Sequence, residues 1–277
     1  MAVISRRRRK KRRLRNLKRA DVAIIGGTGL EAFLKDVEQV RIGTPYGLPP
    51  PISIGEVDGK PVAFLPRHGV YHSIPPHKVN YQANLYALHE IGVERVVSTN
   101  AVGTINPEFK PGDLVVPHDL VDFTKFRKFT FYDDEPVTHV DVSQPYCPTI
   151  RDLLVKAGKR NRERVWGRAV LVCTEGPRYE TSAEIEMFRR IGCDVVGMTG
   201  APESSLAREL EMCYAPICYV SNMAAGMQKR LITSEVGRMA KKKMPVIQQV
   251  LRETVRHLPK RRRCPCAHAL RDARLRG

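Results

Sequence analysis

Several short apolar runs in this sequence end in residues that could bind an anion. The run 22–25 leads into Gly26-Gly27-Thr28-Gly29, and the run 61–66 leads into Arg67-His68-Gly69. A glycine turn exposes backbone N–H groups, Thr28 adds a hydroxyl donor, and a guanidinium can hold an anion through two parallel hydrogen bonds. Each motif alone also has a structural use, as a tight turn or a surface salt bridge. Together, the two motifs indicate an anion site.

Two later runs end in a similar way. The expected strand 95–99 is followed by a loop, Asn100-Ala101-Val102-Gly103-Thr104, and a further strand ends at Val196-Gly197-Met198-Thr199. Ligand sites in open α/β sheets lie at the carboxyl ends of the strands. We therefore expect the strand ends near positions 28, 67, 100 and 199 to converge on one anion.

An aromatic ring and two polar groups could recognise a planar base beside that anion. Tyr179 and Glu180 lie between an expected strand and an expected helix, and Asn222 follows another strand. The ring could stack on a base, the carboxylate could accept a hydrogen bond from its N–H edge, and the amide supplies both a donor and an acceptor. As structural alternatives, Gly176-Pro177 would form only a loop and Asn222 would cap a helix.

The segment 27–32, Gly-Thr-Gly-Leu-Glu-Ala, also matches the glycine pattern of dinucleotide-binding proteins. A dinucleotide site needs a full crossover helix and a second strand ending in Asp or Glu about 20 residues later. Here a short segment, 30–35, leads instead to 40–42 and a hairpin. An NAD-dependent oxidoreductase is therefore a minor alternative.

The elements that must position these residues alternate between strand and helix. The expected strands are 21–25, 52–57, 61–66, 95–99, 113–121, 168–173, 194–197 and 214–220, and the expected helices are 79–91, 149–159, 182–191, 202–211 and 233–257. Strands separated by helices of about 10–15 residues predict an α/β fold, here a single domain with a mixed β-sheet flanked by helices. The polar, aromatic stretch 123–144 is expected to be an excursion outside the core.

The net charge of +18 is concentrated at the two ends. Residues 1–20 contain eleven Lys/Arg and no acid, and residues 257–277 contain seven against Asp272, so the region between them is nearly neutral. A nucleic-acid reader would carry positive charge on a face of its folded domain, whereas the block 6–13 repels itself. We interpret 1–20 as a disordered basic extension, 21–258 as the folded domain and 259–277 as a basic tail. We expect no nucleic-acid partner, and the basic ends are the only alternative route to one.

The seven cysteines and the lack of an apolar signal region indicate a cytoplasmic protein with mostly reduced thiols. No apolar run approaches the ~18 residues of a membrane helix. The motif Cys264-Pro265-Cys266 is an exception of interest, but zinc sites usually separate paired ligands by two or more residues, so no metal is expected. Intracellular disulfides occur in hyperthermophiles, and the many Arg and 20 Pro are compatible with such a source.

Together these segments resemble the trimeric purine nucleoside phosphorylase and methylthioadenosine phosphorylase family. The shared motifs, in the family's order over about 21–258, are Gly26–Gly29, Arg67–Gly69, Lys78–Asn84, Pro111–Asp113, Glu175–Arg178, and Gly197–Thr199 with Pro202-Glu203. Most residues of these motifs resemble those of the methylthioadenosine branch. Asn100-Ala101, Glu180 and Asn222 instead resemble the 6-oxopurine branch.

The resemblance implies phosphorolysis, in which inorganic phosphate attacks the anomeric carbon while the purine leaves. It implies no cofactor, because phosphate is a co-substrate, and it assigns roles by motif. The phosphate-binding residues would be Thr28, Arg67, His68, Asn100, Ala101 and Thr199, and the nucleoside-binding residues would be Met198 under the ribose, Tyr179 on the base, and Glu180, Asn222 and Ala224 around the base.

The base-reading residues favour 6-oxopurines. The methylthioadenosine branch has two aspartates at the positions of Asn222 and Ala224, and carboxylates accept hydrogen bonds from the adenine N6 amino group. An Asn amide can instead donate to O6 or N7, and Glu180 can accept from N1–H. Inosine and guanosine are therefore the expected substrates, in purine salvage.

The 5′ side and the assembly depend on two further positions. Ser234 stands where the methylthio branch has a small apolar residue, and its hydroxyl favours a ribose 5′-OH, although methylthioinosine and methylthioadenosine are alternatives. His139 matches a position that this branch lends across a subunit interface, which implies a homotrimer or a hexamer of two trimers. A noncatalytic polyanion-binding protein is a remote alternative.

Overall fold

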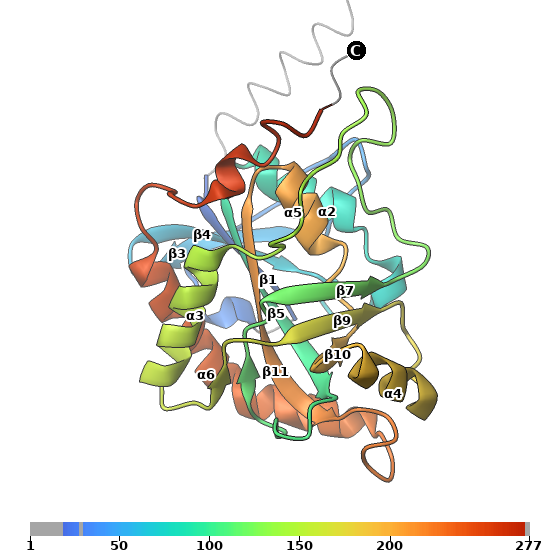
Figure 1. Ribbon diagram of the computed structural model, residues 1–277. Helices are drawn as coiled ribbons and strands as arrows, with labels where there is room; N and C mark the ends of the chain where they lie inside the picture. Colours follow the sequence, from blue (N-terminus) through green and yellow to red (C-terminus); the bar gives the residue numbers. More distant parts are fainter. Residues whose placement is uncertain (1–18, 28–29, 275–277) are drawn as a thin grey trace, which may run out of the picture.

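The structure is a computed structural model that describes residues 19–27 and 30–274 (Figure 1). Its strands are β1 (Val22–Gly26), β2 (Lys35–Val40), β3 (Ile52–Val57), β4 (Lys60–Pro66), β5 (Arg95–Thr104), β6 (Leu114–Val115), β7 (Asp119–Phe123), β8 (Val165–Trp166), β9 (Val170–Thr174), β10 (Val195–Gly197) and β11 (Cys213–Met223). Its α-helices are α2 (Tyr81–Glu90), α3 (Pro148–Arg160), α4 (Ser182–Arg190), α5 (Glu203–Glu209) and α6 (Thr233–His257), and short 3-10 turns are η1 (Leu30–Phe33), η2 (Pro76–Lys78) and η3 (Pro265–His268). The predicted mixed α/β class is confirmed.

Within the described residues, the strands join one mixed sheet of eleven strands. Eight of them follow the order β2-β3-β4-β1-β5-β10-β9-β7, and β11, β6 and β8 branch from β5. β1 pairs in parallel with β4 on one side and with β5 on the other, and the register Gly26↔Pro66 places the end of β1 beside the end of β4. Parallel pairing thus brings Gly27 and Arg67 to the same edge of the sheet.

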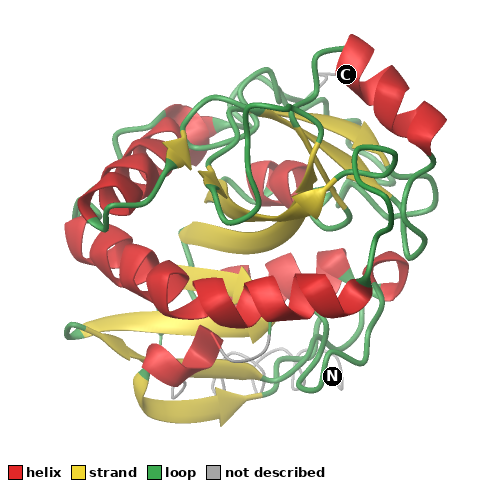
Figure 2. Ribbon diagram, turned by 90° about the horizontal axis from the view of Figure 1, so that it is seen from below, coloured by secondary structure: helices red, strands yellow, loops and turns green. Residues whose placement is uncertain are grey.

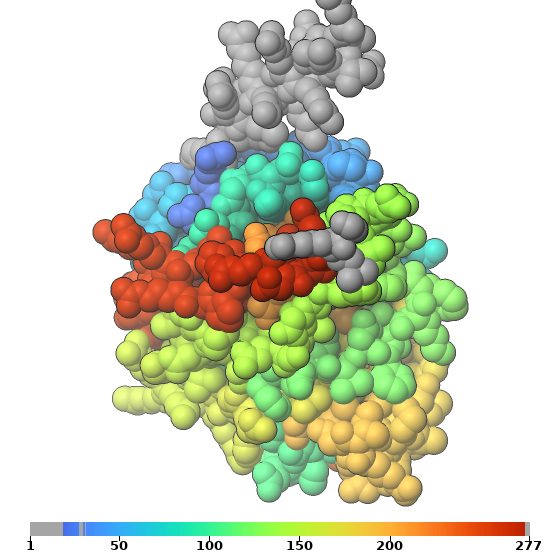
Figure 3. All heavy atoms as spheres, turned by 45° about the horizontal axis from the view of Figure 1, so that its top comes forward, coloured from blue at the N-terminus to red at the C-terminus, as the bar shows by residue number. Residues whose placement is uncertain are grey.

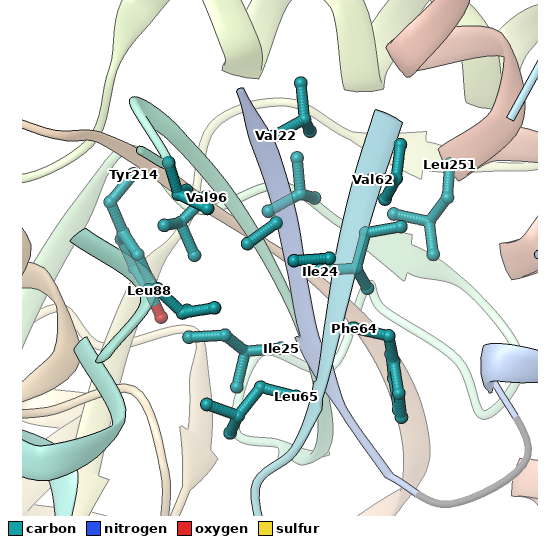
Figure 4. Packing of buried hydrophobic residues seen from close by; sticks show 14 of the residues in the cluster. Val22, Ile24, Ile25, Val62, Phe64, Leu65, Leu88, Val96, Tyr214 and Leu251 are labelled. Atoms are coloured by element: carbon teal, nitrogen blue, oxygen red, sulfur yellow. The ribbon is translucent and has the colours of Figure 1, made fainter. Parts of the chain in front are cut away.

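The core packs around the central strands. Ile24 and Ile25 of β1 are both fully buried, because a parallel strand paired on both sides is covered on both faces. Phe64, Leu88 and Leu251 bring β4, α2 and α6 into the same cluster (Figure 4). α3 packs against α6, and α2 against α5 (Figure 1). Seen from below, α6 is the long helix that crosses in front of the sheet (Figure 2).

The predicted strands 95–99 and 113–121 differ from the strands observed in these regions. β5 continues through Asn100–Gly103, where a loop is predicted, because β11 pairs with it in parallel as far as Met223↔Thr104. The predicted strand 113–121 is divided into β6 and β7, since Pro117 between them has no N–H to donate to a sheet. The first difference matters for the site, because it places Asn100 and Ala101 on rigid sheet.

The segment after α6 packs against the body of the protein. The Arg95 guanidinium donates to the carbonyl of Pro259 at 3.0 Å, and Arg262 pairs with Glu94 at 3.2 Å. In Figure 3 this segment, in red, lies across the surface beside the lime-green segment that contains α3. Among the described helices, none combines the length and apolar character needed to span a membrane.

Candidate active site

A cavity of about 590 Å³ opens where the strand ends meet. Its volume lies within the ~300–1,000 Å³ of small-molecule sites. Ten predicted site residues line it: Arg67, His68, Asn100, Ala101, Tyr179, Glu180, Met198, Thr199, Asn222 and Ala224. The structure therefore brings the predicted anion-binding and base-binding residues together in one place. Thr28 lies outside the described residues, and its neighbour Gly27 lines the cavity.

Arg67 is held by a buried ion pair with Glu203 of α5. Its Nε and Nη2 donate to Oε1 and Oε2 of Glu203 at 2.5 and 3.0 Å, and Nη1 donates to the carbonyl of Thr99 at 3.0 Å. Burial alone would lower the pKa of Arg67, but the Glu203 carboxylate raises it above its ordinary value. The two parallel bonds expected for an anion are therefore used within the protein, and two further N–H groups can face a ligand.

A hydroxyl network fixes Glu203 in turn. The Tyr214 hydroxyl donates to Glu203 Oε2 at 2.7 Å, so the Ser98 hydroxyl, 2.7 Å from the Tyr214 oxygen, must be the donor to Tyr214. Ser98, Tyr214 and Glu203 are at most 2% exposed. In the sequence, Glu203 belongs to the motif Pro202-Glu203, but its pairing with Arg67 is not predicted. The feature that could have pointed to this pairing is an acidic residue in the first turn of α5, a helix whose residues are mostly buried.

His68 is a neutral acceptor near pH 7. Its Nδ1 lies 2.8 Å from the carbonyl of Ile74, and since a carbonyl only accepts, Nδ1 carries the proton. Burial lowers the pKa of His68 to about 4, and the positive charge of Arg67 acts in the same direction. The other ring nitrogen is then an acceptor, suited to a protonated phosphate oxygen. His72, which sequence reasoning missed, also lines the cavity, with its ring centroid 4.4 Å from that of His68.

Thr199 and Asn100 are joined side chain to side chain. The Thr199 hydroxyl donates to Asn100 Oδ1 at 2.9 Å, and Asn100 Nδ2 faces Cys218 Sγ at 3.8 Å. If the Asn100 amide exchanged its two ends, Nδ2 would donate to Thr199 and the hydroxyl hydrogen would be free for an anion. The pair can thus turn one hydroxyl from a donor inside the protein into a donor to a ligand.

Glu180 and Asn222 approach the cavity from different elements. Glu180 precedes α4 and accepts a hydrogen bond from the Thr174 hydroxyl at 2.6 Å. Asn222, in β11, donates from Nδ2 to the carbonyl of Met223 at 2.8 Å and accepts from the Ser221 hydroxyl at 2.5 Å. Each side chain is oriented by the chain and still has one group for a ligand, a second carboxylate oxygen or a second amide N–H.

Met198 lies against the loop that carries Tyr179. Gly176 of this loop has φ +67°, and a Cβ built there would lie 2.7 Å from Met198 Sδ. A side chain at 176 would therefore strain the backbone and displace Met198 at once. Tyr179 is 36% exposed at the rim of the cavity.

One wall of the cavity is the first half of α6. Its lining residues are Thr233, Val236, Gly237, Ala240, Met244 and Ile247, which recur at the three- and four-residue spacing of one helix face. Ser234 is exposed and lies outside the lining, because it is about 100° around the helix from Thr233. The expectation that its hydroxyl faces the 5′ group is not met by this geometry.

Two residues of the excursion 123–144 differ in their exposure to solvent. His139 is exposed, its backbone N–H donates to the carbonyl of Ala273 at 2.7 Å, and it does not line the cavity. Arg127, which sequence reasoning missed, is buried and donates to the carbonyls of Ala201 and Glu175 at 2.6 and 2.8 Å. It therefore fastens the excursion to the segments after β9 and β10.

Comparison with known proteins places this geometry in a family. The family model described as Phosphorylase superfamily matches residues 21–256, and the chain belongs to that family. It is 49% identical to the 6-oxopurine nucleoside phosphorylase of Pyrococcus furiosus, over 91% of this chain and 98% of that protein. It is 48% identical to a probable S-methyl-5'-thioinosine phosphorylase of Methanothermobacter thermautotrophicus, over 91% and 89%. A crystal structure of a methylthioadenosine phosphorylase from an antarctic soil metagenomic library, 36% identical, superposes with a TM-score of 0.88 over 94% of this chain and 93% of that one.

Proposed function

We propose that this protein is a purine nucleoside phosphorylase that cleaves 6-oxopurine nucleosides, inosine and guanosine, with inorganic phosphate. The products are the free base and ribose 1-phosphate, in purine salvage. The observation that carries this proposal is that Glu180 and Asn222 line the same cavity as Arg67 and His68. An anion and a 6-oxopurine can therefore occupy one enclosed site, and the Pyrococcus furiosus relative bears the corresponding name.

The residues act by position and by hydrogen bonding. The remaining N–H groups of Arg67, the Thr199 hydroxyl and the backbone near Ala101 hold phosphate beneath the ribose, with Met198 packed against the sugar. As the glycosidic bond breaks, negative charge develops on the purine, and the Asn222 amide meets it with a hydrogen bond. Glu180 accepts from N1–H. Holding both substrates in register removes most of the entropic cost of their encounter. No metal or cofactor takes part in this scheme.

The proposal is tested by following free base release with and without phosphate from inosine, guanosine, adenosine and methylthioadenosine. We expect phosphate-dependent release of hypoxanthine and guanine, and a specificity constant lower by about 10²–10⁴ for the 6-amino nucleosides, since two mismatched buried groups each cost about 1–3 kcal/mol. Equal efficiency on adenosine or methylthioadenosine would contradict the base assignment.

A second candidate substrate is S-methyl-5'-thioinosine. The α6 wall presents Val236, Ala240 and Met244 to the cavity while Ser234 lies outside it, so an apolar 5′ group could bury surface there. The relative from Methanothermobacter thermautotrophicus carries that substrate in its name. A specificity constant higher for the methylthio nucleoside than for inosine would make it the substrate of choice.

We further propose a cytoplasmic homotrimer or dimer of trimers. Phe126 and Phe129 of the excursion are 90% and 64% exposed and Tyr71 is 89% exposed, and large exposed aromatics are typical of association surfaces. His139 lies on the same excursion and would be lent to a neighbouring cavity. Sedimentation equilibrium would measure the assembly, and a monomer at micromolar concentration with full activity would contradict it.

A further inference from the structure

The two basic ends of the chain join the body of the protein at the same place. The backbone N–H groups of Glu94 and Arg95 donate to the carbonyl of Asp21, the residue before β1. The Arg95 guanidinium donates to the carbonyl of Pro259 at 3.0 Å, two residues after α6 ends. Glu94 and Arg95 therefore lie between the points at which the N-terminal and C-terminal ends leave the folded domain.

This place is at the opposite end of the parallel strands from the active-site cavity. Arg95 is the first residue of β5, and it pairs with Val22 and Cys213, the first residues of β1 and β11. The cavity is lined instead by residues at the carboxyl ends of these strands, such as Asn222 of β11. None of the residues 259–274 lines the cavity. A ligand could therefore bind here while the cavity is in use.

The C-terminal segment 259–274 presents cations that the rest of the protein does not neutralise. It contains six Lys/Arg and a single acid, Asp272. Asp21 is a further exposed acid nearby, whereas Glu94 is already paired with Arg262 at 3.2 Å. Four exposed cations of the segment form no ion pair with another described residue: Lys260, Arg261, Arg263 and Arg271. Positive charge thus exceeds negative charge on this face.

The segment is held on the body by other residues than these four. Arg262, besides its pairing with Glu94, donates from Nη1 to the carbonyl of Glu211 at 2.6 Å. The backbone N–H of Leu270 donates to Glu211 Oε1 at 3.2 Å, and Cys266 is buried. In Figure 3 the segment, in red, lies across the surface of the protein. The four cations therefore stand on a face of the folded domain, as the cations of a nucleic-acid-binding surface do.

The N-terminal end adds positive charge beside this segment. Arg19 is exposed, and a Cβ built at Gly92, two residues before Glu94, would lie 3.9 Å from Arg19 Nε. The other ten of the eleven Lys/Arg in 1–20 lie outside the described residues. They precede Arg19 directly in the sequence, so the N-terminal charge reaches the folded domain next to the C-terminal cations.

We propose that these cations form a basic face that binds double-stranded DNA through its phosphate backbone. The basic face consists of Arg19, Lys260, Arg261, Arg263 and Arg271. Duplex DNA carries one negative charge per ~1.7 Å of helix axis, and its condensed counterions are released when cations bind the phosphates. The segment 259–274 has no aromatic residue, so it offers no ring on which the bases of a single strand could stack.

The binding should have no sequence preference. Sequence is read mainly by an α-helix or a β-ribbon that enters the major groove. The helical part of the segment 259–274 is η3, a 3-10 turn of four residues, and the rest of the segment has no strand. Contacts to phosphates position a protein on the duplex but carry no sequence information. The basic face is therefore suited to any duplex.

The test is binding of the full-length protein to a fluorescent duplex of about 30 base pairs, followed by anisotropy at several salt concentrations. We expect binding at about 50 mM salt and a loss of affinity of about 10³-fold or more at about 200 mM. A duplex of unrelated sequence should bind within about twofold of the first. No binding at the lower salt concentration, or tighter binding of the single strand than of the duplex, would overturn the proposal.

A matched pair of variants separates the basic face from net charge. The face variant combines Lys260→Gln, Arg261→Gln, Arg263→Gln and Arg271→Gln. The control variant combines four exposed positions of the loop after β11 and of α6: Lys229→Gln, Arg230→Gln, Lys241→Gln and Lys242→Gln. Both variants lose the same charge from exposed positions, so both should fold.

We expect the face variant to bind the duplex about tenfold more weakly or worse at about 100 mM salt, with a salt slope lower by about 3–4. The control variant should bind within about twofold of the wild type. Equal loss of binding in the two variants would show that only net charge matters. Unchanged binding in the face variant would assign the DNA to residues 1–18 alone. Either result would overturn the proposal.

Discussion

The buried pair of Arg67 and Glu203 makes an unusual prediction about phosphate. Glu203→Gln keeps the shape of the side chain but removes the charge that neutralises the guanidinium. Both side chains are at most 2% exposed, and removing one partner of a buried ion pair costs about 3–5 kcal/mol. We expect the variant to unfold on the order of 10 °C lower than the wild type.

The same change should strengthen phosphate binding. With Glu203 neutral, Arg67 presents an uncompensated cation to the cavity that it lines, and an anion bound there supplies the missing charge. Tenfold tighter binding adds about 1.4 kcal/mol to the stabilisation at saturating phosphate. Phosphate should therefore raise the melting temperature of Glu203→Gln by several degrees more than it raises that of the wild type.

Thermal unfolding followed across a phosphate titration, without nucleoside, measures both effects. Tyr214→Phe is the matched control, because it removes a hydrogen bond to Glu203 Oε2 but leaves both charges in place. It should lose about 1–2 kcal/mol of stability and show the phosphate increment of the wild type. Equal increments for Glu203→Gln and the wild type would refute the reasoning that Arg67 faces the anion.

Three further substitutions test other parts of the site. Asn222→Asp places a carboxylate where the amide N–H stands, so the ratio of specificity constants should move toward adenosine by about tenfold or more; an unchanged ratio in a competition assay would remove Asn222 from base recognition. His68 has a folded pKa of about 4, below its unfolded value, so folding favours its neutral form, and the stability that this form contributes is lost as the pH falls from about 6.5 toward 4. Between pH 8 and pH 5, the free energy of unfolding of His68→Gln, measured in urea, should fall by about 2 kcal/mol less than that of the wild type. Gly176→Ala should lower both stability and turnover by displacing Met198, and Gly192→Ala, with positive φ but open space around it, should lower stability alone.

The convergence of the site could be predicted from the sequence because it follows from local patterns. Arg67 comes just after the end of an apolar, β-branched run, and the parallel strands β1 and β4 end at one edge. Asn100 and Thr199 meet for a different reason, because β10 runs antiparallel to the extended β5. The two residues proposed to bind the base follow a similar pattern, since Glu180 follows a strand and Asn222 lies near the end of one. Periodicity and turn chemistry therefore carry most of the information about where polar groups gather.

The partners of these groups could not be predicted in the same way. Glu203 is separated from Arg67 by 136 positions, and no local pattern states which carboxylate neutralises which guanidinium. The expected role of Ser234 rests on the family resemblance alone, whereas the direction of its side chain depends on the rotation of α6 against the cavity. The Sγ atoms of Cys213 and Cys264 likewise lie 3.3 Å apart because the C-terminal segment folds back, which the spacing of Cys264 and Cys266 alone does not indicate.

The electrostatics of the cavity have a consequence for the proposed reaction. The charge of Arg67 is neutralised by Glu203, His68 is neutral, and Glu180 adds a carboxylate on the base side, so the cavity presents directed hydrogen bonds more than net positive charge. Phosphate and ribose 1-phosphate carry similar charge, and a strongly cationic site would retain the product as firmly as it captured the substrate. A neutralised guanidinium gives up some affinity for both anions and thereby keeps product release compatible with turnover. The negative charge that develops on the departing purine must then be stabilised by a hydrogen bond from a nearby group, and Asn222 is the residue proposed to donate it.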